Sequence, residues 1–287
     1  MSEKQHYVPR IVINGFLDPS SLNKSNVEPY TWISEKKSNA KKRAASNILW
    51  ERNLYTQYDS NEKEDQALEK FFSTNLEKPF GTFKRIFETD LLNLNINNLE
   101  KNGLWDTRPF INSFVFWHWK RTTKFINEIK EAYISELLQD NPKHLVEKYV
   151  TTKSMQNDLI DTLINAGDQF EGLNIQNLLS KRNITFTVIT NKSASFINSD
   201  NPVLRTNENR PNGVIYPDTE LSMPLTSKIA VTLIGEQSLM QVRGIRESKI
   251  IRKINQSLAK NSNEIIFGSS ESLINSLVGF TKPGAIA

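Results

Sequence analysis

Cysteine is missing from all 287 residues of the chain. Its absence excludes disulfide bonds, thiolate zinc sites and cysteine nucleophiles. A chain of this length buries a large apolar core without covalent crosslinks, so the fold does not need them. Because proteins of a reducing compartment manage without disulfides, we expect a cytoplasmic protein.

Long apolar runs are absent as well. No stretch approaches the roughly 18 consecutive apolar residues that a membrane-spanning helix requires. The opening residues, Met-Ser-Glu-Lys-Gln-His, lack the basic start and the apolar run of a signal peptide. We therefore expect a protein that has no membrane partner.

Several common functional motifs are also missing. The chain contains no GxGxxG, GxxxxGKS/T, GxSxG or HExxH motif. This argues against the usual nucleotide-binding, hydrolase and zinc-protease classes. The formal net charge is only +4, with an isoelectric point near 9.0. A small positive surplus keeps nucleic acid among the candidate partners but does not single it out.

The apolar pattern changes twice along the chain. Residues 1–57 hold a short helix after Pro9 and an aromatic, β-branched segment typical of a strand. Residues 58–181 have helical spacing throughout, and residues 182–287 begin with the period of two that is typical of strands. The sequence thus predicts one α+β domain over residues 1–287. Its helical centre is combined with a small mixed sheet of N-terminal and C-terminal strands.

Short segments in a fixed order resemble a known family. The segments that carry the resemblance are Gln5-His6-Tyr7-Val8-Pro9-Arg10, Tyr30-Thr31-Trp32, Asn53-Leu54-Tyr55, Leu68-Glu69, Leu76-Glu77, Arg121-Thr122, Phe196 to Val203, and Met223-Pro224-Leu225. As a set they resemble the domain of unknown function 4238 family, nearly end to end. The sporadic bacterial distribution of that family suggests a defence or toxin setting.

Two motif segments carry the candidate catalytic residues. His6 titrates near neutral pH and is a candidate general acid or base, while Arg10 offers a fork for phosphate. Asp200 follows a predicted strand, where functional groups are often placed. Each residue also has a structural interpretation: His6 caps a helix, Arg10 pairs with Glu77 or Asp200, and Asp200 satisfies backbone amides of its turn.

Arg121 follows a strongly apolar helical segment. Burying its charge requires a paired acid or an anionic ligand, so it is a candidate substrate-binding residue or a member of a buried network. Glu77 and Asp200 are candidate oxygen ligands for Mg²⁺, the one cofactor that the sequence suggests. Solvated, unrelated carboxylates are the alternative. His118, among aromatic residues, is interpreted as a core residue.

A basic segment in the first third of the chain is the remaining candidate. Lys41, Lys42 and Arg43 lie near Trp32 and Trp50, a composition typical of a loop that contacts phosphate. A solvated surface explains the same residues equally well.

Two hypotheses follow from these residues. The first is a metal-dependent nuclease or phosphodiesterase acting on a phosphate-bearing substrate. His6 would then be the acid or base, Arg10 and Arg121 would hold phosphate, and Asp200 with Glu77 would bind Mg²⁺. The second is a non-catalytic binding or regulatory module in which the same residues form a buried polar network. Exposure discriminates between them, because a catalytic set lines an open cleft.

Overall fold

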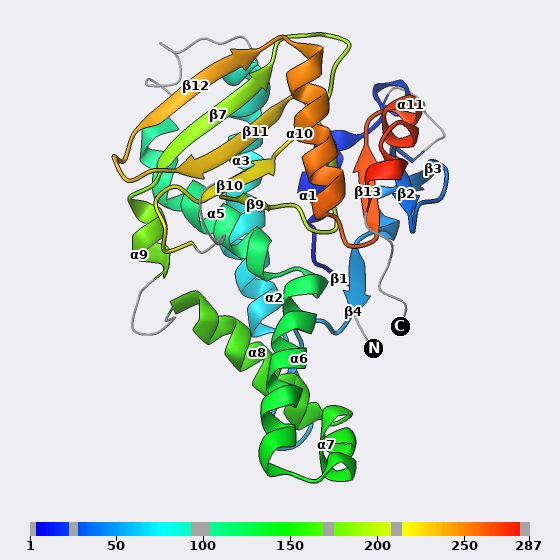
Figure 1. Cartoon of the computed structure of the whole chain (residues 1–287), viewed down its shortest axis with the longest axis vertical. Coiled ribbons are helices and arrows are strands. Elements are labelled where there is room, and N and C mark those ends of the chain that lie inside the picture. The colour runs from blue at the N-terminus through cyan, green and yellow to red at the C-terminus, as the bar shows by residue number, and fades with distance from the viewer. Residues whose placement is uncertain (1–3, 23–27, 93–103, 169–174, 208–213, 282–287) are drawn as a thin grey trace.

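The computed structural model describes residues 4–22, 28–92, 104–168, 175–207 and 214–281. Two sheets form its upper part, and helices cover them and extend below as an arm (Figure 1). Helices and strands are both abundant, so the α+β expectation is confirmed. Within the described ranges, no helix is both long enough and apolar enough to cross a membrane.

The larger sheet has five strands in the order β12-β7-β11-β10-β9. All its neighbours pair antiparallel except β12 and β7, which are parallel. The strands are β7 (Asn183–Ile189), β9 (Leu204–Thr206), β10 (Glu220–Pro224), β11 (Ile229–Ile234) and β12 (Met240–Ile245). This mixed sheet therefore comes entirely from residues 183–245.

The smaller sheet joins the two ends of the chain in the order β3-β2-β13-β8. Its strands are β2 (Tyr30–Glu35), β3 (Lys41–Ala44), β8 (Asn198–Ser199) and β13 (Ile265–Gly268), and all of them pair antiparallel. Two further pairs, β1 (Lys4–His6) with β4 (Trp50–Arg52) and β5 (Gln57–Tyr58) with β6 (Glu64–Asp65), complete the strands described. N-terminal and C-terminal strands do share a sheet, as expected, but it is not the mixed one.

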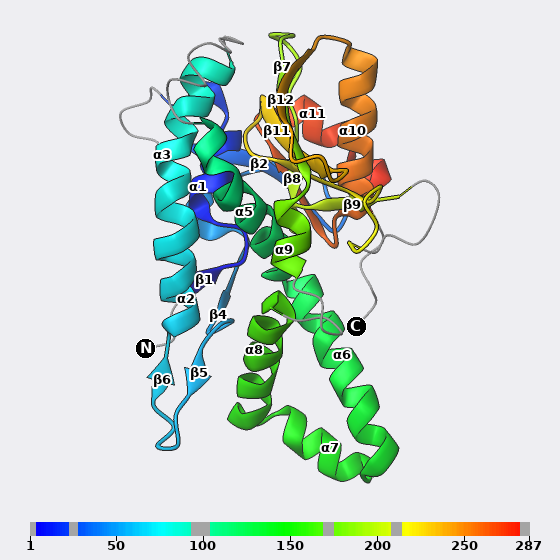
Figure 2. The same ribbon diagram turned by 90° about the vertical axis from the view of Figure 1, so that its left-hand side faces the viewer.

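Helices cover both faces of the five-stranded sheet. Figure 2 shows α3 and α5 on one side and α10 on the other. The helices are α1 (Arg10–Ile13), α2 (Ala67–Phe72), α3 (Lys78–Ile86), α5 (Arg108–Lys120), α6 (Thr123–Asp140), α7 (Lys143–Val150), α8 (Lys153–Asp168), α9 (Ile175–Ser180), α10 (Ser248–Asn261) and α11 (Glu271–Asn275).

Helix α5 lies at the centre of the core because it is apolar on nearly every side. Ile111, Phe114, Val115 and Phe116 are fully buried in it. Such a helix buries several side chains at roughly 1.5–3 kcal/mol each. By contrast, α6 contains no buried residue and forms the arm with α7 and α8 (Figure 1). The end of α5 is thus the point where the core meets the arm.

The N-terminal segment packs directly against the turn that follows β10. A Cβ atom on Gly15 would lie 2.9 Å from the carbonyl oxygen of Leu225, and the Gly15 carbonyl accepts a 2.8 Å hydrogen bond from the amide of Ser227. Only glycine permits so close an approach. Helix α1 accordingly ends at Ile13, before this contact.

Candidate functional site

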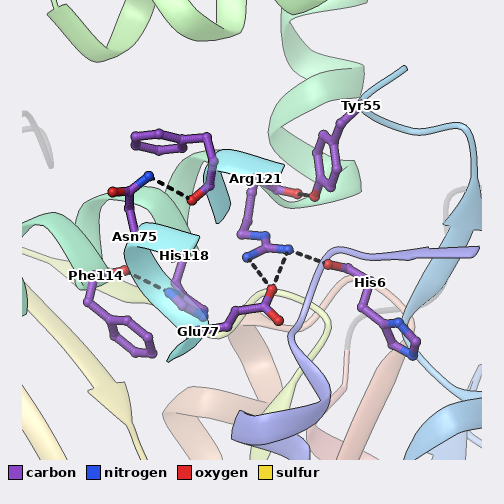
Figure 3. Close-up of polar contacts among 8 residues, drawn as sticks. His6, Tyr55, Asn75, Glu77, Phe114, His118 and Arg121 are labelled. Atoms are coloured by element: carbon purple, nitrogen blue, oxygen red, sulfur yellow. Dashed lines mark hydrogen bonds and ion pairs between the residues drawn. The ribbon is translucent and has the colours of Figure 1, made fainter. Parts of the chain in front are cut away.

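The side chain of Arg121 is the centre of the site, and it is fully buried at the C-terminal end of α5. Its Nη2 donates a 2.6 Å hydrogen bond to the backbone carbonyl of His6. Nη1 and Nη2 lie 3.3 Å and 3.4 Å from Oε1 of Glu77. Figure 3 shows the guanidinium between these two acceptors. Arg121 therefore ties the first strand of the chain to the early helices.

Aromatic rings surround the same guanidinium. Its carbon lies 4.3 Å from the ring centre of Phe72 and 5.6 Å from that of Tyr55. The hydroxyl of Tyr55 donates a 2.5 Å hydrogen bond to the Arg121 carbonyl (Figure 3). Burial lowers the pKa of Arg121, but Tyr55 and Glu77 outweigh that effect and raise the pKa above its ordinary value. The side chain is a permanent, compensated cation.

Glu77 reaches Arg121 from a wide helical turn. Residues Ser73–Glu77 form a π-helical turn between α2 and α3, so the two helices run on as one. Such turns insert one extra residue and often accompany functional sites. The Glu77 side chain is 28% exposed, whereas Arg121 is wholly enclosed. The pair is therefore half-buried, with the carboxylate on the outer side.

The imidazole of His6 points away from Arg121 (Figure 3). Burial, together with the nearby charges of Arg10 and Arg121, lowers the pKa of His6 to about 4. At neutral pH the ring is uncharged and has no acidic proton for a general-acid step. His6 contributes its backbone carbonyl to the Arg121 network, and a general-base role stays a prediction.

Arg10 lies at the first position of α1 and is exposed. Neither Glu77 nor Asp200 pairs with it among the ion pairs of the described residues. The structure thus gives Arg10 no place in the Arg121 network.

Asp200 is buried, and its carboxylate binds backbone amides. It accepts hydrogen bonds of 2.8 Å, 2.7 Å and 2.9 Å from the amides of Asn263, Glu264 and Ile265, the turn between α10 and β13. Burial raises the pKa of Asp200, and the three amides offset part of this. Burial, and then the charge of Asp200, raise the pKa of Tyr7, so the two motif segments lie near each other. Asp200 therefore holds a turn in place.

The donor set predicted for Mg²⁺ does not fit a hexacoordinate ion. Glu77 Oε1 already accepts from Arg121, and both oxygens of Asp200 accept from backbone amides. In the ranges that the structure describes, no three His, Asp or Glu side chains are grouped to hold a metal.

Lys41, Lys42 and Arg43 form β3, and all three have local contacts. Lys41 Nζ lies 2.5 Å from Oε2 of Glu35. Lys42 lies over the rings of Tyr30 and Trp32, at 4.9 Å and 5.2 Å from their centres. Arg43 is exposed and donates to the Lys42 carbonyl. Phosphate binding by this segment stays a prediction.

His118 is a core residue, as its aromatic neighbours suggest. It is fully buried, and its Nδ1 lies 2.7 Å from the carbonyl of Phe114 (Figure 3). Burial and Arg121 lower its pKa to about 3, so it is neutral at physiological pH.

A pocket of about 180 Å³ opens where the segments after Arg121 and Asp200 meet. We call it the cationic pocket. It lies between the start of α6 and β9 and is lined by Trp119, Thr122, Lys124, Phe125, Glu128, Asn201, Val203, Arg205 and Asn261. Thr122 caps α6 by accepting a hydrogen bond from the Phe125 amide. The pocket thus brings together two segments that the sequence singled out separately.

Lys120 lies beside the cationic pocket, against two of its walls. Its Nζ is 4.0 Å from the ring centre of Trp119 and 3.8 Å from that of Phe125. Burial, and then the charge of Arg205, lower the pKa of Lys120 to about 7, while Glu128 opposes them. Arg205 lies over Trp119 at 5.1 Å. Three basic side chains, Lys120, Lys124 and Arg205, therefore lie in or beside the pocket around one carboxylate, Glu128.

Sequence reasoning missed this group. A lysine inside the aromatic run Phe116 to Trp119 and Phe125 was a usable signal, because such a cation must be desolvated. Arg205 had no signal of its own, since one arginine in a short strand is ordinary.

The sequence of the chain matches one family model over nearly its whole length. The model of the family described as protein of unknown function (DUF4238) matches residues 4–273. The chain belongs to the DUF4238 family. No curated protein and no solved structure matches it. The DUF4238 match includes every residue of the Arg121 network and of the cationic pocket.

Proposed function

We propose that this DUF4238 chain is a non-catalytic binding module that takes a phosphate-bearing ligand in the cationic pocket. The observation that carries the proposal is the excess of cations there. Lys120, Lys124 and Arg205 lie around the one carboxylate of the pocket lining, Glu128, whose contact with Lys124 is a 3.9 Å pair along one helical turn. Basic groups outnumber the one carboxylate of the pocket lining, so an anion would be bound favourably there.

The state of Lys120 supports the same ligand class. A cation whose pKa falls because of burial and a neighbouring cation gains most from an anion at close range. A cavity of about 150 Å³ is large enough for benzene. The cationic pocket, at about 180 Å³, therefore suits a phosphate group with a small organic part.

The Arg121 network supports a structural rather than a catalytic role for the remaining motif residues. Its guanidinium is enclosed and bonded to Glu77 and to the His6 carbonyl. A catalytic set is expected to face an open cleft. Nuclease chemistry by His6, Arg10 and Asp200 stays a competing prediction.

Phosphate binding is the direct test. Calorimetric titration with inorganic phosphate and with AMP is expected to show binding, and adenosine, which lacks phosphate, is expected to show none. Arg205→Gln and Lys124→Gln should each weaken binding by about tenfold, the loss of roughly one charge-assisted hydrogen bond. The matched control is Lys143→Gln, which breaks a similar 3.7 Å pair with Glu147 on α7, outside the pocket. Equal affinity in all variants would contradict the proposal.

A second partner is favoured by the exposed face of α10. This helix carries Lys249, Arg252, Lys253 and Lys260 and no acidic residue. All four are exposed, opposite the buried Ile251 side of the helix. Within the described ranges none forms an ion pair. A stripe of unpaired cations along a helix suits the backbone of a nucleic acid.

Nucleic acid binding and cleavage are tested together. Labelled RNA, single-stranded DNA and duplex DNA are incubated with the protein, with Mg²⁺ or with chelator, and followed by anisotropy and on gels. Binding that weakens with salt, and is lost in Lys249→Glu/Lys260→Glu but not in Lys143→Glu, would support the α10 face. Cleavage by the wild type would instead favour the nuclease hypothesis over the non-catalytic module. Absence of both would remove nucleic acid as a partner.

A further inference from the structure

A second cavity lies between the five-stranded sheet and α10. Its volume is about 250 Å³, and it shares no lining residue with the cationic pocket. Its apolar wall consists of Phe196, Leu204, Met223, Pro224, Ala230, Ile254 and Leu258. We call it the sheet cavity. Its apolar wall is what the body of an organic ligand needs.

A row of hydroxyl groups crosses the sheet side of this cavity. The Ser222 hydroxyl lies 2.9 Å from that of Thr232 and donates a 2.5 Å hydrogen bond to Glu220. Thr187 accepts a 3.1 Å hydrogen bond from Nε of Arg243. Each hydroxyl has one donor and two acceptor positions, so the row also offers hydrogen bonds to a polar ligand atom.

The charged groups at the sheet cavity are two cations and one carboxylate. Arg243 comes from β12, Lys253 from α10 and Glu220 from β10. Glu220 already accepts a hydrogen bond from Ser222. Arg243 uses Nε for Thr187, which orients its guanidinium, and neither cation has an ion-pair partner in the described residues. The local surplus is therefore positive.

We propose that the sheet cavity binds a small amphipathic carboxylic acid. Its aromatic or branched body packs on Leu204 and Ile254, the partly exposed apolar residues of the wall, and its carboxylate binds Arg243 and Lys253. Carboxylates bind guanidinium groups through paired hydrogen bonds, which supplies the specificity. The cavity is larger than the roughly 150 Å³ that holds benzene, so one ring with a short acidic arm fits. The inference is independent of phosphate binding at the cationic pocket, because the two sites share no residue.

Three probes of similar size test the head group. Phenylacetate, phenethyl alcohol and phenethylamine have the same ring and differ in charge. The chain has four methionines, so the methyl signal of Met223 is easily assigned in a methyl-labelled sample. Phenylacetate is expected to shift that signal saturably, the alcohol to bind at least fivefold more weakly, and the amine not to bind. No saturable shift with phenylacetate, or equal binding of all three, would overturn the proposal.

Paired variants locate the site. Arg243→Gln should weaken phenylacetate binding at least fivefold, whereas Arg246→Gln, just beyond β12, should leave it unchanged. Ser257→Leu should fill the cavity and abolish binding, whereas Gln256→Leu, one position away and outside the lining, should not. All four changes are made on surface or rim positions, and thermal unfolding of each variant confirms that it folds. Equal effects within either pair would overturn the assignment.

Discussion

Lys120 and Arg121 are consecutive residues at the end of α5, yet their side chains lie in opposite kinds of environment. Arg121 is enclosed with a carboxylate, a carbonyl and two rings. Lys120 faces aromatic rings and another cation, and its pKa falls to about 7. Arg121 thus has compensating partners inside the core, whereas Lys120 lies beside a second basic group, Arg205.

The same contrast distinguishes the polar groups of the family motifs from those of the cationic pocket. The segments around His6, Glu77 and Asp200 use their polar groups to join strands, helices and a turn. The cationic pocket between α6 and β9 is instead lined by Lys124, Arg205 and Glu128. The motif residues thus hold elements of the fold together, and under the function proposed above Lys120, Lys124 and Arg205 would contact the ligand.

Removing the Arg121 side chain is expected to have the largest effect. Arg121→Ala leaves Glu77 and the His6 carbonyl without their partner and opens a void beside Phe72, which should cost about 3–5 kcal/mol of unfolding free energy. Urea unfolding measures the loss. Arg121→Met/Glu77→Gln, which removes both charges and keeps volume, should recover part of it. A loss below about 1 kcal/mol for Arg121→Ala would mean that the network is not a structural one.

Asp200→Ala should rank second. It leaves the amides of Asn263, Glu264 and Ile265 without their acceptor, at about 3 kcal/mol, the upper end of the cost of an unsatisfied buried group. Asp161→Asn is the matched control, because Asp161 accepts an exposed hydrogen bond from Gln57. If Asp200→Ala were as stable as the control but had lost an activity, the catalytic interpretation would gain.

Lys120 should make stability depend on pH. Its pKa is lowered from 10.5 to about 7 in the folded protein, so the unfolded chain binds more protons between these values and stability rises with pH across that window. From about pH 7 to pH 9, the unfolding free energy of the wild type should rise by about 2 kcal/mol more than that of Lys120→Met. Urea unfolding of both proteins measures this difference. Saturating phosphate should reduce the difference. A constant difference across this range would show that Lys120 titrates normally.

The smallest effect is expected on β3. Lys41 and Glu35 form a pair whose side chains are each more than one third exposed, so Lys41→Ala should change the unfolding free energy by no more than about 0.5 kcal/mol. Thermal unfolding at low and high salt is the measurement. A larger loss of unfolding free energy that disappears at high salt would show that the pair of Lys41 and Glu35 stabilises the fold electrostatically.

Some features of the structure were readable in the sequence because they depend on local pattern. The helix near residues 248–260 is found at Ser248–Asn261, and the apolar run around Phe114 forms a buried helix. The sequence also predicts that a buried Arg121 requires a paired acid or an anionic ligand, and the structure places Glu77 beside it. The α+β class followed from the change of period, and the single domain over residues 1–287 stays a prediction.

Other features depend on contacts between distant segments, which no local pattern reveals. Asp200 does satisfy backbone amides, but those amides lie 63 to 65 residues further along the chain instead of in its own turn. Arg205 joins Lys120 only because β9 returns beside the end of α5. The strands after residue 182 divide between the two larger sheets because β13 pairs with β2 from the other end of the chain.

The short edge strand β9 has a consequence of its own. Successive residues of a strand face opposite sides. Leu204 lines the sheet cavity, and Arg205 lines the cationic pocket. One strand of three residues is thus a wall shared by two chambers. If filling one chamber displaces this wall, it must alter affinity in the other by the same factor in both directions, since such coupling is reciprocal. Binding of a ligand at either site would then depend on the ligand at the other, because a single strand separates the two.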